Sequence, residues 1–311
     1  MTRQSAHTDV ILGLSHRLHW DTLFPFIRSL HRTTFSGELH LFVGGTDAGT
    51  NEALRRAGAF VHAYHRLRFE RRGHVFHPYE LPLRRFRLSR VTARYPAAIR
   101  TLTAYSREPL VARAKLAAKI SIPYVARFFR FFEFLASAPI AYRNVMLTDV
   151  RDVFFQRDPF DFDIGNRVNC FLEDERQTLG SERHNRAWLT TAYGEEVARS
   201  LADKPISCSG VTIGSRDAVF EYLRVLVGEL LELRTQSVGI DQGVHNYVLH
   251  RELVPRSALL RNWDGPVLTL ALVPPAEVEA AARNGRLNAN VLHQYNHHPQ
   301  LSARLLHELV A

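Results

Sequence analysis

The first part of the chain alternates between short apolar runs and segments whose apolar residues recur at helical spacing. Residues 20–33 and 50–59 repeat apolar side chains every three to four positions, which is typical of an amphipathic helix. Strands that are joined by helices pair in parallel with right-handed crossovers, so this part predicts an α/β sheet. Its strands are the apolar runs DVILGLS (9–15), ELHLFVGG (38–45) and FVHAY (60–64).

The later part of the chain continues the alternation with longer helices. Segment 122–137 carries a one-sided stripe of large apolar residues, which predicts a helix packed on the core. The stripe consists of Phe128, Phe131, Phe132 and Leu135. Periodicity predicts further helices at 216–234 and 239–253, and strands at 168–175, 209–215, 266–272 and 290–296. The sequence has no internal repeat or low-complexity linker, which favours one continuous domain over 1–311. We expect a Rossmann-like, mixed but mostly parallel sheet flanked by helices.

The composition places the chain among ordinary globular proteins. Of its 311 residues, 46% are hydrophobic and 23% are charged, enough to bury a substantial core. No apolar run reaches the roughly 18 residues of a membrane span, and the N-terminus lacks the pattern of a signal peptide, so we expect a cytoplasmic protein. Cys170 and Cys208 are too few for a disulfide framework and are predicted to be buried thiols.

The positive charge of the chain is concentrated in one segment. Residues 61–120 hold 14 Lys and Arg against 3 Asp and Glu, while the net charge of the whole chain is +9. Arginines alternate there with Phe, Tyr and Leu, a composition suited to phosphates, anionic lipid headgroups or an acidic acceptor. A solvated arginine-rich surface is the alternative. Residues 65–120 are therefore interpreted as a basic insertion, with peripheral membrane contact through 65–100. No nucleic-acid-binding motif accompanies the charge, so no nucleic acid is expected.

The clearest chemical signal is VMLTDVRDVFF at 145–155, an apolar run that ends in Asp149 and Asp152. A buried strand that delivers two carboxylates to its carboxyl end is typical of a site for a divalent metal or a phosphate-bearing ligand. Carboxylates three residues apart lie on opposite faces of a strand unless the chain turns between them. If it turns, both can reach a metal; otherwise Asp152 is the ligand and Asp149 binds a ribose or sugar hydroxyl. A capping pair after the strand is the structural alternative.

From Val10 to His297 the order of these blocks resembles a GT-A type nucleotide-sugar glycosyltransferase. It is most similar to the retaining metal-dependent families that include glycogenin and the bacterial lipooligosaccharide galactosyltransferases. The resemblance lies in scattered blocks over most of the chain: the Arg127 helix, LTDVRDVFFQRDPF, CSGVTIG, GIDQGVHNYVL and VLHQY. The spacing of Asp149 and Asp152 departs from the D-x-D pattern of those families.

The resemblance implies a metal site that clamps the diphosphate of the donor. Its protein ligands would be Asp149, Asp152 and His293, and an imidazole ligand favours Mn²⁺ over Mg²⁺. Arg127 would reach the donor phosphates or sugar with its planar guanidinium. Arg151 would neutralise a phosphate or pair with an aspartate. A surface charge for Arg127 and a buried structural imidazole for His293 are the alternatives.

The remaining predicted site residues occupy strand ends and a helix start. Gly13 and Ser15 end the first strand, where ligands of open α/β sheets bind, and would lie beside the nucleotide base. The resemblance places Asp241 and Gln242 at the transferred sugar as the catalytic pair, although Asp241 also suits a helix cap. Ser209 and Gly210 would permit close backbone approach to the donor sugar or acceptor; a tight turn explains the glycine equally well.

These expectations combine into one functional hypothesis. The chain would transfer a sugar from a UDP-sugar to a glycan or lipid-linked acceptor, with metal dependence and retention, at the inner face of the membrane. Residues 1–150 would form the nucleotide-binding half and 151–311 the acceptor-binding half. A non-catalytic glycan- or anion-binding protein and a sugar nucleotidyltransferase are the alternatives; the second would normally have a glycine-rich loop after the first strand, whereas LGLSHRLHW has one glycine.

Overall fold

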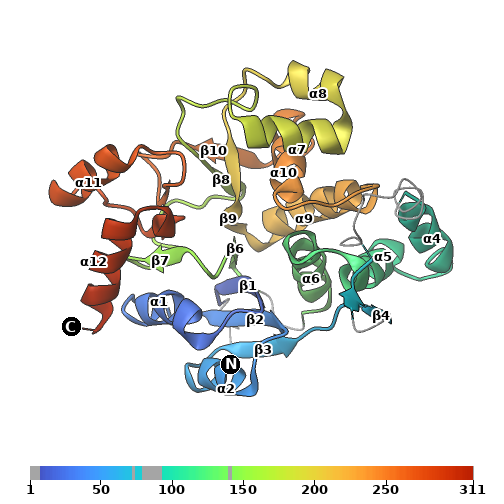
Figure 1. Ribbon diagram of the computed structural model, residues 1–311, viewed down its shortest axis with the longest axis horizontal. Helices are drawn as coiled ribbons and strands as arrows, with labels where there is room; N and C mark the ends of the chain where they lie inside the picture. The colour runs from blue at the N-terminus through green and yellow to red at the C-terminus, as the bar shows by residue number, and fades with distance from the viewer. Residues whose placement is uncertain (1–7, 72–73, 79–92, 139–141, 311) are drawn as a thin grey trace, which may run out of the picture.

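A central sheet of seven strands organises the computed structural model of the chain (Figure 1). The structure describes residues 8–71, 74–78, 93–138 and 142–310. The arginines at 84, 85, 87 and 90 of the predicted basic insertion therefore lie outside the described residues. Within the described ranges no helix is both long and apolar enough to cross a membrane.

The sheet is mixed and mostly parallel, as predicted. Its order is β10-β8-β9-β6-β1-β2-β3. Strand β1 pairs in parallel with β2 and β6, β2 with β3, and β8 with β10, whereas β9 runs antiparallel to both β6 and β8. The bounds are β1 Val10–His16, β2 Glu38–Gly44, β3 Phe60–Ala63, β6 Asn144–Thr148, β8 Val168–Leu172, β9 Ser207–Ser215 and β10 Ser257–Leu260.

Helices cover both faces of this sheet, which explains why its central strands β1, β2 and β6 are mostly apolar and buried. Along β1, Val10 and Leu12 belong to the core cluster that includes α6 and α9, whereas Ile11 belongs to the cluster that includes α1. This alternation is the two-residue period of a strand. Helix α1 spans Trp20–His31, α6 spans Pro123–Ser137 and α9 spans Arg216–Leu231.

Most predicted helices agree with the structure to within a few residues. Helix α2 (Ala48–Arg56) begins two residues before the predicted 50–59, because the Asp47 side chain accepts the Thr50 backbone N–H and caps it there. Helix α10 (Ile240–His250) matches the predicted 239–253. The structure adds helices that the periodicity did not predict: α4 Tyr95–Leu102, α5 Pro109–Ile120, α7 Arg183–Tyr193, α8 Glu195–Ser200, α11 Pro275–Arg283 and α12 Pro299–Val310.

A second sheet of three short strands lies beside the first and brings distant segments together. Strand β12 (Val291–His293) pairs in parallel with β11 (Val267–Thr269) and antiparallel with β7 (Val153–Phe155). In this register His293 stands opposite Val153, directly after the aspartate motif. A further hairpin of β4 (Phe69–Arg71) and β5 (His74–Phe76) belongs to the basic segment. The β12–β7 pairing therefore places the late histidine at the acidic loop.

The predicted aromatic stripe of α6 is confirmed as core. Phe128, Phe131, Phe132 and Leu135 are all buried, and α6 packs on α5, α9 and β1. Helix α6 is thereby fixed against the sheet with its N-terminal end near the end of β1. Arg127, on the first turns of this helix, is carried into the interior with it.

Candidate functional site

The chain turns between the two aspartates, which is the arrangement that lets both reach one point. Strand β6 ends at Thr148 and β7 begins at Val153, so Asp149 to Asp152 form the bend between them. Val150 in this bend is buried over Gly13 of β1; a Cβ at Gly13 would lie 2.4 Å from the Val150 Cγ1 atom. Gly13 therefore makes room for the turn.

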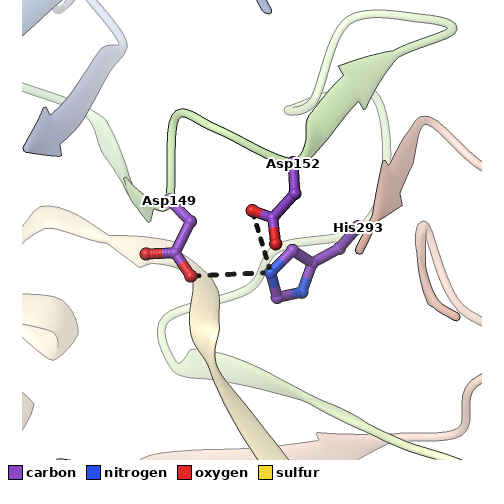
Figure 2. Close-up of side chains that lie close together, drawn as sticks. All are labelled: Asp149, Asp152 and His293. Atoms are coloured by element: carbon purple, nitrogen blue, oxygen red, sulfur yellow. Dashed lines mark ion pairs between the residues drawn. The ribbon is translucent and has the colours of Figure 1, made fainter. Parts of the chain in front are cut away.

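The turn brings the carboxylates of Asp149 and Asp152 to the imidazole of His293 (Figure 2). The His293 Nε2 atom lies 3.6 Å from Asp149 Oδ2 and 3.9 Å from Asp152 Oδ1. Ligand atoms about 2.1 Å from a metal ion lie about 3 to 3.6 Å from one another. The distance to Asp149 is at the upper end of this range, and all three ligand atoms lie within 4.8 Å of one another, so a contraction around a cation would bring the three groups into its coordination sphere. This group could bind a metal ion.

The environment of His293 supports the same interpretation. Its side chain is fully buried, and among the described residues neither ring nitrogen has a partner within hydrogen-bond distance, so Nε2 has only the two longer ion pairs with Asp149 and Asp152. A buried polar group without a partner is destabilising, and native structures rarely tolerate one without a water or an ion. A cation between His293 and the two carboxylates would give Nε2 a direct ligand bond in place of these long ion pairs.

Gly210 on β9 keeps the space between these ligands open. A Cβ atom there would lie 2.3 Å from His293 Cε1 and 2.5 Å from both His293 Nε2 and Asp149 Oδ2. The Gly210 carbonyl also accepts the backbone N–H of Asp149 at 2.7 Å, which fixes the start of the bend. The predicted donor-binding residue Gly210 thus lies directly against the candidate metal centre.

Arg127 connects the centre to two further predicted site residues. Its Nη1 group pairs with Asp149 Oδ1, and its Nη2 group donates to Asp241 Oδ2 at 2.7 Å and to Ser209 Oγ at 3.2 Å. Arg127 is only 5% exposed, so it is not the surface charge that was the alternative. One buried guanidinium therefore holds α6, the acidic bend, β9 and the start of α10 together.

The ionisation of the centre follows from burial and from this guanidinium. Burial raises the pKa of Asp149, but the Arg127 and His293 charges outweigh it, and the net shift is downward. Burial dominates at Asp152 and at Asp241, whose pKa values are raised. Burial lowers the pKa of His293, but the acidic groups around it reverse the shift and raise that pKa. A divalent cation would displace the imidazole proton and stabilise both carboxylates as anions.

The two predicted catalytic residues lie behind the centre at the N-terminus of α10. Asp241 is buried and paired with Arg127. The amide of Gln242 donates to Glu173 Oε1 at 2.9 Å and to Asn185 Oδ1 at 3.0 Å, which ties α10 to the end of β8 and to α7. Burial raises the pKa of Glu173 to about 7. Gln242 is thus oriented by a carboxyl group that is partly protonated at neutral pH.

A cleft of about 410 Å³ opens above the centre, outside the carboxyl ends of β1 and β6. Of the predicted site residues, Arg127, Asp149, Arg151 and Asp152 line it. Arg151 is exposed at its rim, and among the described residues no carboxylate pairs with it. Its other lining residues are Leu14, His16, Leu18, Pro123, Tyr124, Val150, Asn296 and His297.

Gly13 and Ser15 lie next to the cleft rather than in its lining. Strand β1 contributes Leu14 and His16 to the wall, and Ser15 between them points to the other face and is fully buried. Sequence reasoning overlooked His16 and Tyr124. His16 directly follows Ser15, and Tyr124 precedes Arg127 by three residues, which puts both on one face of α6. That spacing was the available signal for Tyr124.

The protein-family models and the curated proteins contain no match to this chain.

Proposed function

We propose that the chain is a metal-dependent glycosyltransferase of the GT-A type that uses a nucleoside-diphosphate sugar, with UDP as the nucleotide and Mn²⁺ as the preferred ion. The observation that carries this proposal is the meeting of Asp149, Asp152 and His293, whose ring nitrogens have no hydrogen bond among the described residues, around the space left by Gly210. Two carboxylates and one imidazole are a donor set that suits Mn²⁺ better than Mg²⁺. The same donor set suits other transition metals, so UDP binding should be compared between Mn²⁺ and other divalent ions.

The cleft supports a diphosphate ligand above this centre. It lies at the carboxyl ends of parallel strands, where open α/β sheets bind nucleotides. Its volume of about 410 Å³ falls within the range of about 300 to 1,000 Å³ of small-molecule sites. Arg151 at the rim offers an exposed guanidinium for a phosphate. Tyr124 and Leu14 supply flat and apolar surface that suits a nucleotide base.

The residues around the centre would have separate roles in binding the ion and the donor. A bound ion would stabilise the negative charge that develops on the departing diphosphate. Arg127 pairs with Oδ1 of Asp149, which leaves Oδ2 of Asp149 facing His293. The pairing of β12 with β7 fixes the His293 imidazole next to this carboxylate. Asp241 reaches the centre through Arg127, and we propose that it orients this guanidinium toward the donor sugar. Retention at the anomeric carbon belongs to the proposal through the family resemblance alone.

The test is calorimetry of UDP binding with and without Mn²⁺, followed by a screen of nucleotide sugars for metal-dependent hydrolysis. Wild type should bind UDP only with the ion. Asp152→Asn keeps the shape of the side chain but removes an anionic ligand, so it should weaken Mn²⁺ binding by about 100-fold or more. Asp161→Asn, at an exposed aspartate nine residues further on, is the matched control and should bind as wild type does. Metal-independent UDP binding, or normal binding by Asp152→Asn, would contradict the proposal.

A non-catalytic protein that binds a sugar nucleotide or another anion is the second candidate. The observation in its favour is that Asp241 and Gln242 are both buried and engaged with protein partners. Such a protein would bind UDP with Mn²⁺ but would not hydrolyse any nucleotide sugar. The hydrolysis screen therefore separates the two candidates without an acceptor.

A further inference from the structure

Apolar side chains at one edge of the molecule extend the core cluster of α6 and α9 to the surface, since Ile99 belongs to that cluster and Leu116 and Ile120 pack against it. A groove of about 190 Å³ runs between α4, α5 and the chain after β3, and its lining is almost wholly apolar. Leu102 at its rim is 75% exposed and Leu67 is 46% exposed, while Tyr105, three residues after α4, is fully exposed. Exposed apolar residues that occur singly need no explanation, but a groove lined by two of them, with Tyr105 three residues beyond the end of α4, indicates an interaction surface.

The same edge carries cations that have no acidic partner among the described residues. Arg68 follows Leu67, Arg94 precedes Tyr95, Arg107 follows Tyr105 by two residues, and Lys119 precedes Ile120. All of these cations are exposed, and within the described part of the chain no carboxylate pairs with any of them. Arg100 on α4 differs from these four cations, because it forms an ion pair with Glu232. The surface is thus both apolar and positively charged.

We propose that this surface, formed by α4, α5 and Leu67–Arg68 and called here the α4–α5 edge, docks on an anionic lipid bilayer. Leu102 and Tyr105 would enter the headgroup region, and the four exposed cations would contact lipid phosphates. Tyrosine suits this boundary because its ring is apolar and its hydroxyl is polar. A soluble polyanion would use the cations but would gain little from Leu102, which is why the bilayer fits the surface better.

The α4–α5 edge adjoins the cleft of the candidate site. Ile120 lines the groove, and Pro123 and Tyr124, just after it in the chain, line the cleft. Two hydrogen bonds fix this junction: Arg66 Nε donates to the Ser121 carbonyl at 2.8 Å, and Leu67 N–H donates to the Lys119 carbonyl at 2.7 Å. Figure 1 shows α4 and α5 at the side of the molecule next to α6, whose N-terminus borders the cleft. Docking would therefore hold the cleft near the bilayer, and, where the proposed function holds, the acceptor would be a lipid-linked glycan.

The experiment is sedimentation of the full chain with vesicles of phosphatidylcholine alone or mixed with phosphatidylglycerol. Wild type should bind only the anionic vesicles and should dissociate as salt increases. The double variant Leu102→Ser/Tyr105→Ser should bind about tenfold more weakly because it loses the apolar contribution. Arg94→Ser/Arg107→Ser should lower binding to a similar extent.

The matched control is Leu306→Ser/Val310→Ser on α12, where Val310 is as exposed as Leu102. It should bind the vesicles as wild type does. Absence of binding to anionic vesicles would overturn the proposal. So would normal binding by Leu102→Ser/Tyr105→Ser together with loss in Arg94→Ser/Arg107→Ser, because that result indicates a polyanion site without insertion. Equal loss in the α12 control would also overturn it.

Vesicle binding and donor chemistry fail independently. All four surface positions lie outside the cleft, so metal-dependent hydrolysis of a nucleotide sugar by these variants in solution should match that of wild type. Vesicle binding without any hydrolysis would leave the docking surface in place and remove the proposed enzyme. Hydrolysis without vesicle binding would support the proposed enzyme and remove the docking surface.

Discussion

A missing Cβ atom is what makes room for the candidate metal centre. Gly210 lies where its carbonyl fixes Asp149 while its empty side faces His293. At most positions a glycine serves backbone conformation, but no positive φ is found at Gly210. The reason for glycine here is the space that it leaves between two ligands.

Gly210→Ala should therefore abolish or strongly weaken Mn²⁺ binding, because the new methyl group takes the place of the ion. The clash with the buried imidazole should also lower the free energy of unfolding by about 1 to 3 kcal/mol. Calorimetry with Mn²⁺ and urea denaturation without it measure the two effects separately. Gly228→Ala on α9 is the control, since no described atom lies within 4 Å of its Cβ position. Full Mn²⁺ affinity in Gly210→Ala would show that the ion does not bind between these residues.

Glu173 should give the protein a characteristic pH dependence. Burial raises its pKa to about 7 in the folded state, against an ordinary value of 4.5. The folded state therefore holds a proton that the unfolded state has lost, so this contribution to stability is complete below pH 4.5 and disappears as the pH rises through about 7. At about 1.4 kcal/mol per pKa unit, the loss amounts to about 3 kcal/mol.

Glu173→Gln should remove this dependence, because a glutamine can still accept the hydrogen bond from Gln242. Urea denaturation of both proteins at pH 4.5 and pH 7.5 gives the comparison. Wild type should lose about 3 kcal/mol more than the variant over this interval. Parallel losses in the two proteins would mean that Glu173 titrates normally.

At the scale of elements, the late strand β12 shares a hydrophobic cluster with helix α12, which follows it in the chain. Leu292 of β12 shares a core cluster with Leu301, Leu305 and Leu309 of α12. These α12 residues recur every four positions and form the apolar face of the helix. Packing of α12 therefore supports the strand that carries His293.

Leu305→Ala should lower the free energy of unfolding by about 2 to 5 kcal/mol, because it leaves a cavity in the core cluster that includes Leu292 of β12. Leu305 is 2% exposed, whereas its neighbour Leu306 is 41% exposed. Leu306→Ala, with the same chemical change, should stay within about 0.5 kcal/mol of wild type. Urea denaturation of the three proteins tests the pair. Similar losses for both substitutions would contradict the assigned orientation of α12.

Strands with long apolar runs could be predicted from the sequence, whereas several short helices could not; α12 was missed although Leu301, Leu305 and Leu309 recur every four positions. Strands β1, β2 and β6 are buried on both faces, so their apolar runs were unambiguous. Helix α7 has only Asn185 and Leu189 buried, which leaves no stripe to detect. The predicted strand 290–296 is shortened to β12 because Gln294 adopts a positive φ of 59° and a 3₁₀ turn follows.

The candidate site was predictable in its residues but not in its contacts. The Asp149, Asp152 and His293 group was predicted, and the structure brings these three together. The pairing of Arg127 with Asp241 and of Gln242 with Glu173 depends on how α6, α10 and β8 pack, which no local pattern encodes. A donor role for Gly13 and Ser15 stays a prediction.

At the scale of the molecule, the centre joins segments that are far apart in the chain. Arg127 comes from α6, the aspartates from the bend after β6, Ser209 and Gly210 from β9, Asp241 from α10 and His293 from β12. The bend connects β6 of the seven-stranded sheet to β7 of the three-stranded sheet, and β12 pairs with β7. An ion bound here would therefore cross-link the central seven-stranded sheet to the three-stranded sheet of β11, β12 and β7.

Mn²⁺ should consequently stabilise the whole fold and not only the site. An ion at 100 times its dissociation constant that binds only the folded state adds about 2.7 kcal/mol to the free energy of unfolding. For a chain of this size that corresponds to a rise of a few degrees in the melting temperature. Calorimetric melting with Mn²⁺, and again after addition of a chelator, measures the shift and its reversal. Asp152→Asn should show a much smaller shift, because its affinity for the ion is about 100-fold lower, whereas Leu305→Ala should melt lower yet keep the full shift. A shift of equal size in Asp152→Asn would place the ion elsewhere on the protein.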